Sequence, residues 1–260
     1  AGRWEQAAVI VVLERVGKAI RTPGRDAMIS EATSSIGRGM GFGIHEALDQ
    51  VGAVAGPVIV SLAIYLSGDY KVGFAILAIP AMITLVFLDI SRRNFPRTSV
   101  NVYRASKPRS NPRISKKFMS YLLFVFTSSG GLISFQLLSY HVKTGNFVPD
   151  YLLPLLYGLA MGVDAIAALG IGRAYDKHGL KVLIILPLLI IPIIPLTLFS
   201  TVISIVVAVT VWGIVIGMQE TVLRAAVAEL SDSSSIGFAY GLLNATYGIA
   251  LMTGGFVMGM

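Results

Sequence analysis

Long apolar runs dominate this sequence of 260 residues, and they limit the fold more than any other feature. Most of them reach about 17 residues or more, the length that a helix needs to cross ~30 Å of hydrocarbon. Hydrophobic residues make up 55% of the chain and charged residues only 13%, whereas soluble domains carry roughly 25% charge. Short alternating strands, the pattern of a membrane barrel, are absent from the sequence. The sequence therefore predicts an all-α polytopic membrane protein.

Eight apolar segments are expected to cross the bilayer, at about residues 4–32, 39–66, 72–88, 118–142, 151–173, 182–199, 203–230 and 236–260. Ser128, Ser129, Gly130 and Gly131 predict a break in the fourth segment. Residues 91–117 contain nine Lys or Arg and no acid, together with Pro, Ser and Asn, which is typical of a linker. The positive-inside rule predicts that this linker is cytoplasmic. We expect an integral protein of a prokaryotic cytoplasmic membrane.

The distribution of charge and the lack of cysteine exclude several classes of function. The net charge is +7, but its concentration in one loop argues for topology rather than for nucleic-acid binding. The chain has no cysteine, which excludes disulfides and thiolate metal sites. Its three histidines are scattered and show no metal spacing. No cofactor, no metal and no nucleic-acid partner are therefore expected, and no nucleophile with a base indicates an enzyme.

Ionisable residues inside the predicted spans indicate a pathway, because each buried charge costs at least ~2.5–3.5 kcal/mol. The candidates for a coupling or substrate pathway are Glu14, Arg15, His45, Glu46, Asp49, Asp164 and Glu220. Asp49 lies roughly 15 Å into its span and is the strongest candidate for a proton-coupling group. His45 and Glu46, about one turn away, would relay protons to it. The alternative is structural: Asp49 pairs with Arg15 or Lys18 and holds two helices together.

Residues 43–57, GIHEALDQVGAVAGP, combine these charges with small residues. Gly43, Gly52 and Gly56 lie on or near one face in this interpretation. The four-residue spacing of Gly52 and Gly56 predicts close packing against a neighbouring helix. Pro57 removes one backbone donor and favours a bend. A single helix is thus expected to combine tight packing, a hinge and ionisable groups.

The start and the end of the chain repeat one another. SSIG at 34–37 recurs at 234–237, and Arg25-Asp26-Ala27 matches Arg224-Ala225-Ala226. Phe42-Gly43 likewise matches Tyr240-Gly241. A long-period repeat in the same orientation predicts two halves related by an axis along the membrane normal.

Two motifs of the chain resemble those of the major facilitator superfamily, and the resemblance extends over the whole length. Residues 172–181, GRAYDKHGLK, are similar to the signature loop GxxxD(R/K)xGx(R/K). Residues 43–57 resemble the fifth-helix motif of the antiporters, although Val60 and Ser61 replace its final glycine pair. The resemblance implies a helical bundle of two parallel-repeat halves, of which this chain would be a fragment with spans four to eleven. Residues 1–90 would belong to the N-terminal half, 91–117 to the linker and 118–260 to the C-terminal half.

The signature residues are Gly172, Asp176, Lys177, Gly179 and Lys181, and the resemblance implies that they form a gating loop. Asp176 would lie at a helix end, where a carboxylate receives hydrogen-bond donors and a cation, and Gly179 would permit a tight turn. We expect that Asp176 holds the cytoplasmic gate closed.

The function expected from this sequence is secondary transport by alternating access, with protons, a small-molecule substrate and the lipid bilayer as partners. Proton-coupled export of a small organic or amphipathic compound is the leading version, because of the glycine motif. The alternatives are uptake by proton symport and a non-transporting signalling or scaffold protein of the same fold. A monomer is expected for the full-length protein.

Overall fold

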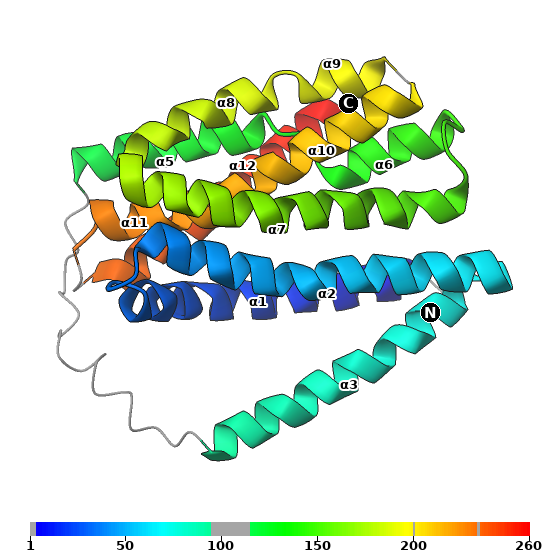
Figure 1. The fold of residues 1–260 in the computed structure, drawn as a ribbon, viewed down its shortest axis with the longest axis horizontal. Helices are drawn as coiled ribbons and strands as arrows, with labels where there is room; N and C mark the ends of the chain where they lie inside the picture. The colour runs from blue at the N-terminus through cyan, green and yellow to red at the C-terminus, as the bar shows by residue number, and fades with distance from the viewer. Residues whose placement is uncertain (1–3, 95–114, 200, 233–234) are drawn as a thin grey trace.

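The computed structural model describes residues 4–94, 115–199, 201–232 and 235–260, and every regular element among them is helical (Figure 1). The all-α prediction is therefore confirmed for this part of the chain. Residues 95–114, most of the predicted basic linker, lie outside the described residues. The helices before this gap are called the leading segment, and those after it the trailing segment.

The leading segment consists of three long helices, α1 (Trp4–Ala32), α2 (Arg38–Ser67) and α3 (Tyr70–Asn94). α2 ends at Gly68, which has a left-handed φ of 68° and donates its N–H to the carbonyl of Ile64 at 2.8 Å. This glycine cap lets the chain reverse directly into α3. Figure 1 shows that α3 leaves the other helices as it runs away from this turn. Pro57 lies inside α2 without ending it.

The trailing segment contains the remaining elements: α5 (Lys116–Gly130), α6 (Phe135–Thr144), η2 (Asp150–Leu152), α7 (Leu153–His178), η3 (Gly179–Ile184), α8 (Ile185–Ile190), α9 (Ile193–Leu198), α10 (Val202–Met218), η4 (Gln219–Leu223), α11 (Arg224–Leu230) and α12 (Ile236–Gly259). The predicted break in the fourth segment is confirmed, because α5 ends at Gly130 and α6 begins only at Phe135. Ser134 caps the new helix by accepting a hydrogen bond from the backbone N–H of Leu137. η4 is a single π-helical turn between α10 and α11.

Six helical segments of the described residues are long and apolar enough to cross a membrane. One of them, Asp150–Leu198, is a run of 49 residues that contains two of the predicted passes. The chain turns back within it at Gly179, whose φ is 61°, so α7 and α8 run antiparallel (Figure 1). α1 is long enough but is not among the six, because its charged residues interrupt the apolar stretch that a membrane-spanning helix needs. The eight expected passes thus reduce to seven by this criterion, with α1 as the exception.

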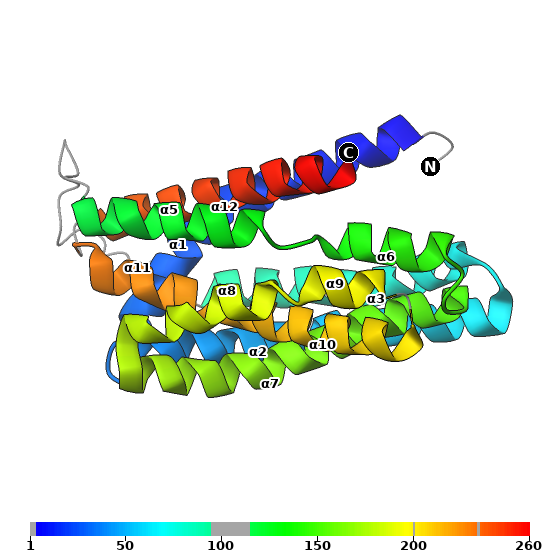
Figure 2. The same ribbon diagram turned by 90° about the horizontal axis from the view of Figure 1, so that it is seen from above.

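The helices form two layers. Figure 2 shows α1, α5 and α12 in one layer, and α2, α7 and α10 in the other. Small residues let several of these helices approach closely: a Cβ added to Gly213 of α10 would overlap with the carbonyl oxygen of Ala160 on α7. A Cβ on Gly254 of α12 would likewise overlap with the carbonyl of Gly130 on α5.

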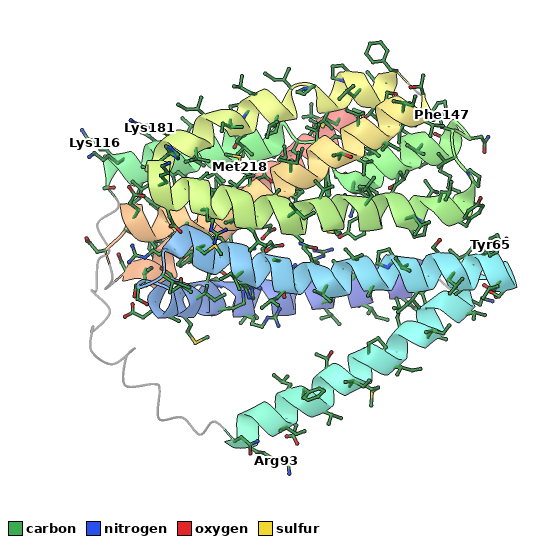
Figure 3. The ribbon with its side chains drawn as sticks, in the orientation of Figure 1. Tyr65, Arg93, Lys116, Phe147, Lys181 and Met218 are labelled. Carbon is green, nitrogen blue, oxygen red and sulfur yellow. The ribbon has the colours of Figure 1, made fainter. Side chains whose placement is uncertain are left out.

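Basic residues gather at one end of this bundle. Figure 3 shows Arg93, Lys116 and Lys181 toward the same end, whereas Tyr65 and Phe147 lie toward the other. The same end carries the beginning of α2 and the end of α7 (Figure 1). We call it the latch end, for the contact described next.

Candidate functional site

The most extensive contact between the leading and trailing segments is the crossing of α2 and α7. A Cβ added to Gly39 would overlap with the carbonyl oxygen of Gly172, and a Cβ on Gly172 would overlap with that of Gly39. A Cβ on Gly43 would lie only 2.6 Å from the carbonyl oxygen of Ala168. The two backbones therefore touch at a seam that only small residues permit.

Gly52 and Gly56, which the sequence predicts to pack closely against a neighbouring helix, take no part in this seam. No described atom other than their own chain neighbours and helix lies within 4 Å of a Cβ built on either glycine. The reason is helical phase: Gly52 follows Gly43 by roughly two and a half turns, which places it on the opposite face of α2. Pro57, nearly four whole turns after Gly43, does face α7, since its Cβ lies 3.7 Å from a Cβ built on Gly158.

Asp176 joins the end of α7 to the beginning of α2. Its Oδ1 accepts a hydrogen bond from the backbone N–H of Gly39 at 2.8 Å, and its Oδ2 accepts one from Met40 at 2.7 Å. The first N–H groups of a helix have no partner inside the helix, and they carry the positive end of its dipole. Gly37, with a φ of 99°, leaves the room that the carboxylate occupies. We call this contact the latch.

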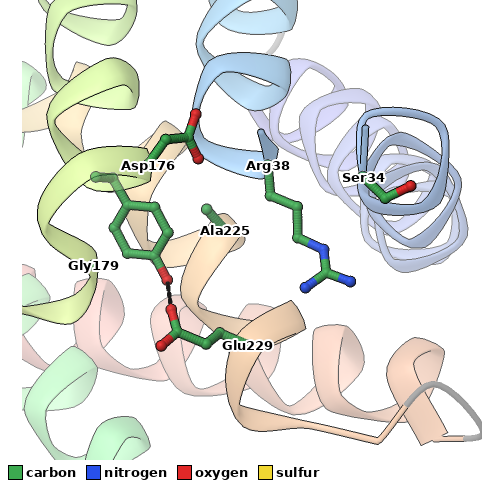
Figure 4. Close-up of a pocket in the computed structure, with 7 residues that line it drawn as sticks. Ser34, Arg38, Asp176, Gly179, Ala225 and Glu229 are labelled. Atoms are coloured by element: carbon green, nitrogen blue, oxygen red, sulfur yellow. Dashed lines mark hydrogen bonds between the residues drawn. The ribbon is translucent and has the colours of Figure 1, made fainter. Parts of the chain in front are cut away.

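Side chains of both segments surround the latch (Figure 4). Tyr175 donates its hydroxyl to Glu229 Oε2 at 2.5 Å, and Arg38 donates from Nη1 to the carbonyl of Ala228 at 3.3 Å. An open cavity of 460 Å³ lies here and is lined by Ser34, Arg38, Tyr175, Asp176, Gly179, Ala225 and Glu229. Lys177 and Lys181 of the signature loop are exposed. The carboxylate of Asp176 therefore makes its contacts with a helix end.

A second polar group lies deeper in the bundle, between α1, α2, α7 and α11. We call it the buried charge cluster, and its members are Asp26, Glu46, Gln50, Asp164, Glu220 and Arg224. Arg224 is its centre: Nη1 lies 3.5 Å from Glu46 Oε2, and Nε lies 3.5 Å from Asp26 Oδ2. Arg224 also pairs with Glu220, one turn earlier along the chain. This one guanidinium thus links α1 and α2 of the leading segment to the trailing segment.

Gln50 completes the cluster with a bridge between α2 and α7. Its Nε2 donates to Glu46 Oε1 at 2.6 Å and to Asp164 Oδ2 at 2.7 Å. Asp164 is completely buried, and Glu46 and Gln50 are nearly so. The structure therefore brings together three of the predicted pathway residues, namely Glu46, Asp164 and Glu220.

The other predicted pathway residues lie apart from this cluster. The side chain of Asp49 is 58% exposed, with Oδ2 at 3.9 Å from Arg25 Nη1 and at 3.8 Å from His45 Nε2. Its ion-pair partner is thus Arg25, and neither Arg15 nor Lys18 as the structural alternative predicted. Glu14 and Arg15 pair with one another at 3.3 Å on a largely exposed part of α1.

Sequence reasoning missed three members of the cluster as site residues: Asp26, Gln50 and Arg224. Gln50 is uncharged, so a search for ionisable residues passes over it. Asp26 and Arg224 were both contained in the internal repeat, which aligned Arg25-Asp26-Ala27 with Arg224-Ala225-Ala226. The structure brings these two matched segments into contact through Asp26 and Arg224, so the repeat was the signal that could have found them. Among the described residues, no group of three or more His, Asp or Glu side chains could hold a metal ion.

Membrane-length helices, small-residue crossings and buried charges that link two segments define a polytopic helical membrane bundle with a gate-like contact. The chain belongs to the major facilitator superfamily: the sequence model of that family matches residues 1–255. This is a family of membrane transporters rather than of enzymes, as the motifs predicted.

Two relatives illustrate how far the similarity extends. An uncharacterized protein of Mycobacterium tuberculosis is 36% identical over 266 residues, which cover 100% of this chain and 65% of that protein. An uncharacterized MFS-type transporter of Methanocaldococcus jannaschii is 26% identical over 267 residues, 98% of this chain and 65% of that protein. The chain thus spans about 65% of the length of the curated relatives that it matches. No solved structure matches this chain significantly.

Proposed function

We propose that the protein is a secondary transporter that alternates access between two helical halves, residues 1–90 and 118–260, joined by the linker 91–117. The observation that carries this proposal is the latch, in which Asp176 of one half holds the beginning of α2 in the other. Two hydrogen bonds and a seam of small residues hold this contact, and both can separate without unfolding either half.

The transported species in this proposal is a small organic or amphipathic compound, exported in exchange for protons. The support for proton coupling is the row of carboxylates along α2 and α7. Asp49 is exposed and would exchange protons with water, with His45 beside it. Glu46, Asp164 and Glu220 are the more enclosed members of the proposed pathway, and Glu14 and Arg15, on the largely exposed part of α1, are its outlying members.

The latch end faces the cytoplasm in this proposal, and the protein is a monomer in the cytoplasmic membrane of a prokaryote. The support is the gathering of Arg93, Lys116 and Lys181 at that end (Figure 3). The 260 residues contain no cysteine, so a single cysteine at Ser110, in the linker, is a clean reporter. We expect an impermeant thiol reagent to reach it only from the inside of the membrane; labelling of intact cells from outside would reverse the orientation.

Transport itself is tested with the full-length protein in liposomes. A panel of fluorescent amphipathic cations and anions is added, and a pH difference is imposed across the membrane. Export coupled to protons predicts accumulation of at least one compound on the acidic side, which a protonophore abolishes. Accumulation on the alkaline side would show proton symport instead. Flux that is equal to protein-free liposomes for every compound, with either sign of the pH difference, would favour the non-transporting alternative.

A further inference from the structure

Asp164 lacks the cation that a buried carboxylate needs. The nearest polar partner of its Oδ2 is the neutral amide of Gln50, and its Oδ1 is buried without any hydrogen-bond partner among the described residues. No Lys, Arg or His nitrogen of the described chain lies within ion-pair distance of it. The other buried carboxylates, Asp26 and Glu46, each have Arg224 within 3.5 Å.

The charges of the cluster do not balance if every acid is ionised. Its four carboxylates are Asp26, Glu46, Asp164 and Glu220, and they face Arg224, with Arg25 as a second cation on Asp26. An isolated ionised carboxylate in a medium of low dielectric constant is much more costly than an unpaired buried hydroxyl, so such a group takes up a proton instead. One acid of the cluster is therefore far more stable in its neutral form, and Asp164 is the one without a cation.

We propose that Asp164 carries a proton on Oδ1 while the latch is closed, and that Gln50 couples this proton to the contact of α2 with α7. The inference rests on the proposed transport function and deepens it by naming the residue that stores the proton. Oδ2 accepts the hydrogen bond from Gln50, which leaves Oδ1 to hold the proton.

Every element packed around Asp164 fits this assignment. Glu46 and Gln50 of α2 face Asp164. Arg224 at the start of α11 also faces it, but its guanidinium is already shared among three other carboxylates. Tyr157 on α7 itself and Tyr247 on α12 are the neutral titratable groups nearby. α10 contributes Gly217, on which a Cβ would lie 2.8 Å from Asp164 Oδ1, so this wall has no room for a charged side chain.

Loss of the proton would weaken the contact between the two segments. With Asp164 ionised, two negative carboxylates, Glu46 on α2 and Asp164 on α7, would flank one neutral amide, and hydration of Asp164 requires that α2 and α7 separate. The same two helices carry the glycine seam and the latch about three turns away. Deprotonation of Asp164 and opening of the latch are therefore one linked equilibrium.

The test measures opening directly and needs no substrate. Spin labels on cysteines introduced at Ser34 and Asp232, both exposed near the latch end, report the separation of the two segments in the full-length protein in liposomes. The distance distribution gives the populations of the closed and open states. We expect the ratio of closed to open molecules to fall as the pH rises, by up to about tenfold per pH unit, which is the limit for one proton. Asp164→Asn should stay closed at every pH, whereas Asp69→Asn, a matched change at an exposed turn, should keep the profile of the unmodified protein.

Two outcomes would overturn the proposal: a pH-dependent opening that persists in Asp164→Asn, or no pH dependence in the unmodified protein. If Asp164→Asn does not fold, Gln50→Leu serves instead. It removes the amide that links Asp164 to α2, so the dependence of opening on pH should weaken, and an unchanged profile would contradict the coupling. The distances can be measured even if no transport is detected. A failure of the proposed proton site can therefore be told apart from a failure of the proposed transport function.

Discussion

α2 carries two pairs of glycines with the same four-residue spacing, and only one pair touches another helix. Gly39 and Gly43 meet the backbone of α7, whereas Gly52 and Gly56 have open space beside them in the described chain. The sequence pattern is the same in both places, so spacing alone predicts a smooth face on the helix but not its partner. Which face is used depends on the phase of the helix relative to the residues that bind across the interface.

The first pair is placed by polar contacts on either side of it. Asp176 holds the beginning of α2 before the seam, and Gln50 binds Asp164 beyond it. Both contacts fix the rotation of α2, and the glycines that then face α7 are those in phase with Gln50 and Pro57. The glycines that pack against another helix are thus the pair that lies between two polar contacts with that helix, whereas the other pair has no such contacts beside it.

The largest effect is expected from bulk in the seam. Gly39→Leu places a side chain where the carbonyl of Gly172 lies, so overpacking should cost at least ~1–3 kcal/mol and keep the latch from closing. Gly52→Leu, the same change in the open stretch, is the control and should leave thermal stability nearly unchanged. Thermal unfolding in detergent and the spin-label distances measure both. Equal losses in the two variants would remove the distinction between the stretches.

A smaller effect is expected from the latch itself. Asp176→Asn keeps the shape of the side chain but removes the charge that binds the N–H groups of Gly39 and Met40, a loss of about 1–2 kcal/mol at this partly exposed site. The closed fraction and the transport rate should fall while insertion into the membrane stays intact. Unchanged flux and unchanged distances in Asp176→Asn would leave the signature loop as a topological turn only.

Asp49→Asn tests the exposed side of the same helix. Its contacts with Arg25 and His45 are long and the side chain is 58% exposed, so they stabilise the protein by only ~0–1 kcal/mol. Stability and latch closure should therefore persist, and only proton-driven accumulation should slow. Accumulation at the full rate under an imposed pH difference would show that Asp49 does not belong to the proton pathway.

The smallest effect is expected for Gly56→Leu. The described chain leaves space beside Gly56, so expression, stability and transport should all stay close to those of the unmodified protein. A defect as large as that of Gly39→Leu would show that a segment outside these 260 residues packs on this face, and the two glycine pairs would then be equivalent.

The sequence predicted the parts of the molecule that follow from composition and local backbone chemistry. The apolar runs, the break between α5 and α6 and the turn at Gly179 are confirmed, and the expected helix end beside Asp176 is the beginning of α2. Gly43 and Gly52 were expected on or near one face, but their spacing of nine residues puts Gly52 on the side of α2 opposite Gly43, which faces α7. Gln50 was missed because its importance arises only from the two carboxylates that tertiary packing brings to it.

The π-helical turn η4 has a consequence for the tolerance of this chain to insertions and deletions. A π turn absorbs one residue more than an α turn, so deletion of one residue within Gln219–Leu223 would restore regular α-helix and keep the register, whereas insertion of one further residue there would rotate everything after it by about 100°. Arg224 would then point away from Asp26 and Glu46, and the buried acids would lose the cation that they share. The rotational phase of α11 relative to α10, as much as the identity of Arg224, therefore determines whether the two segments can bind each other.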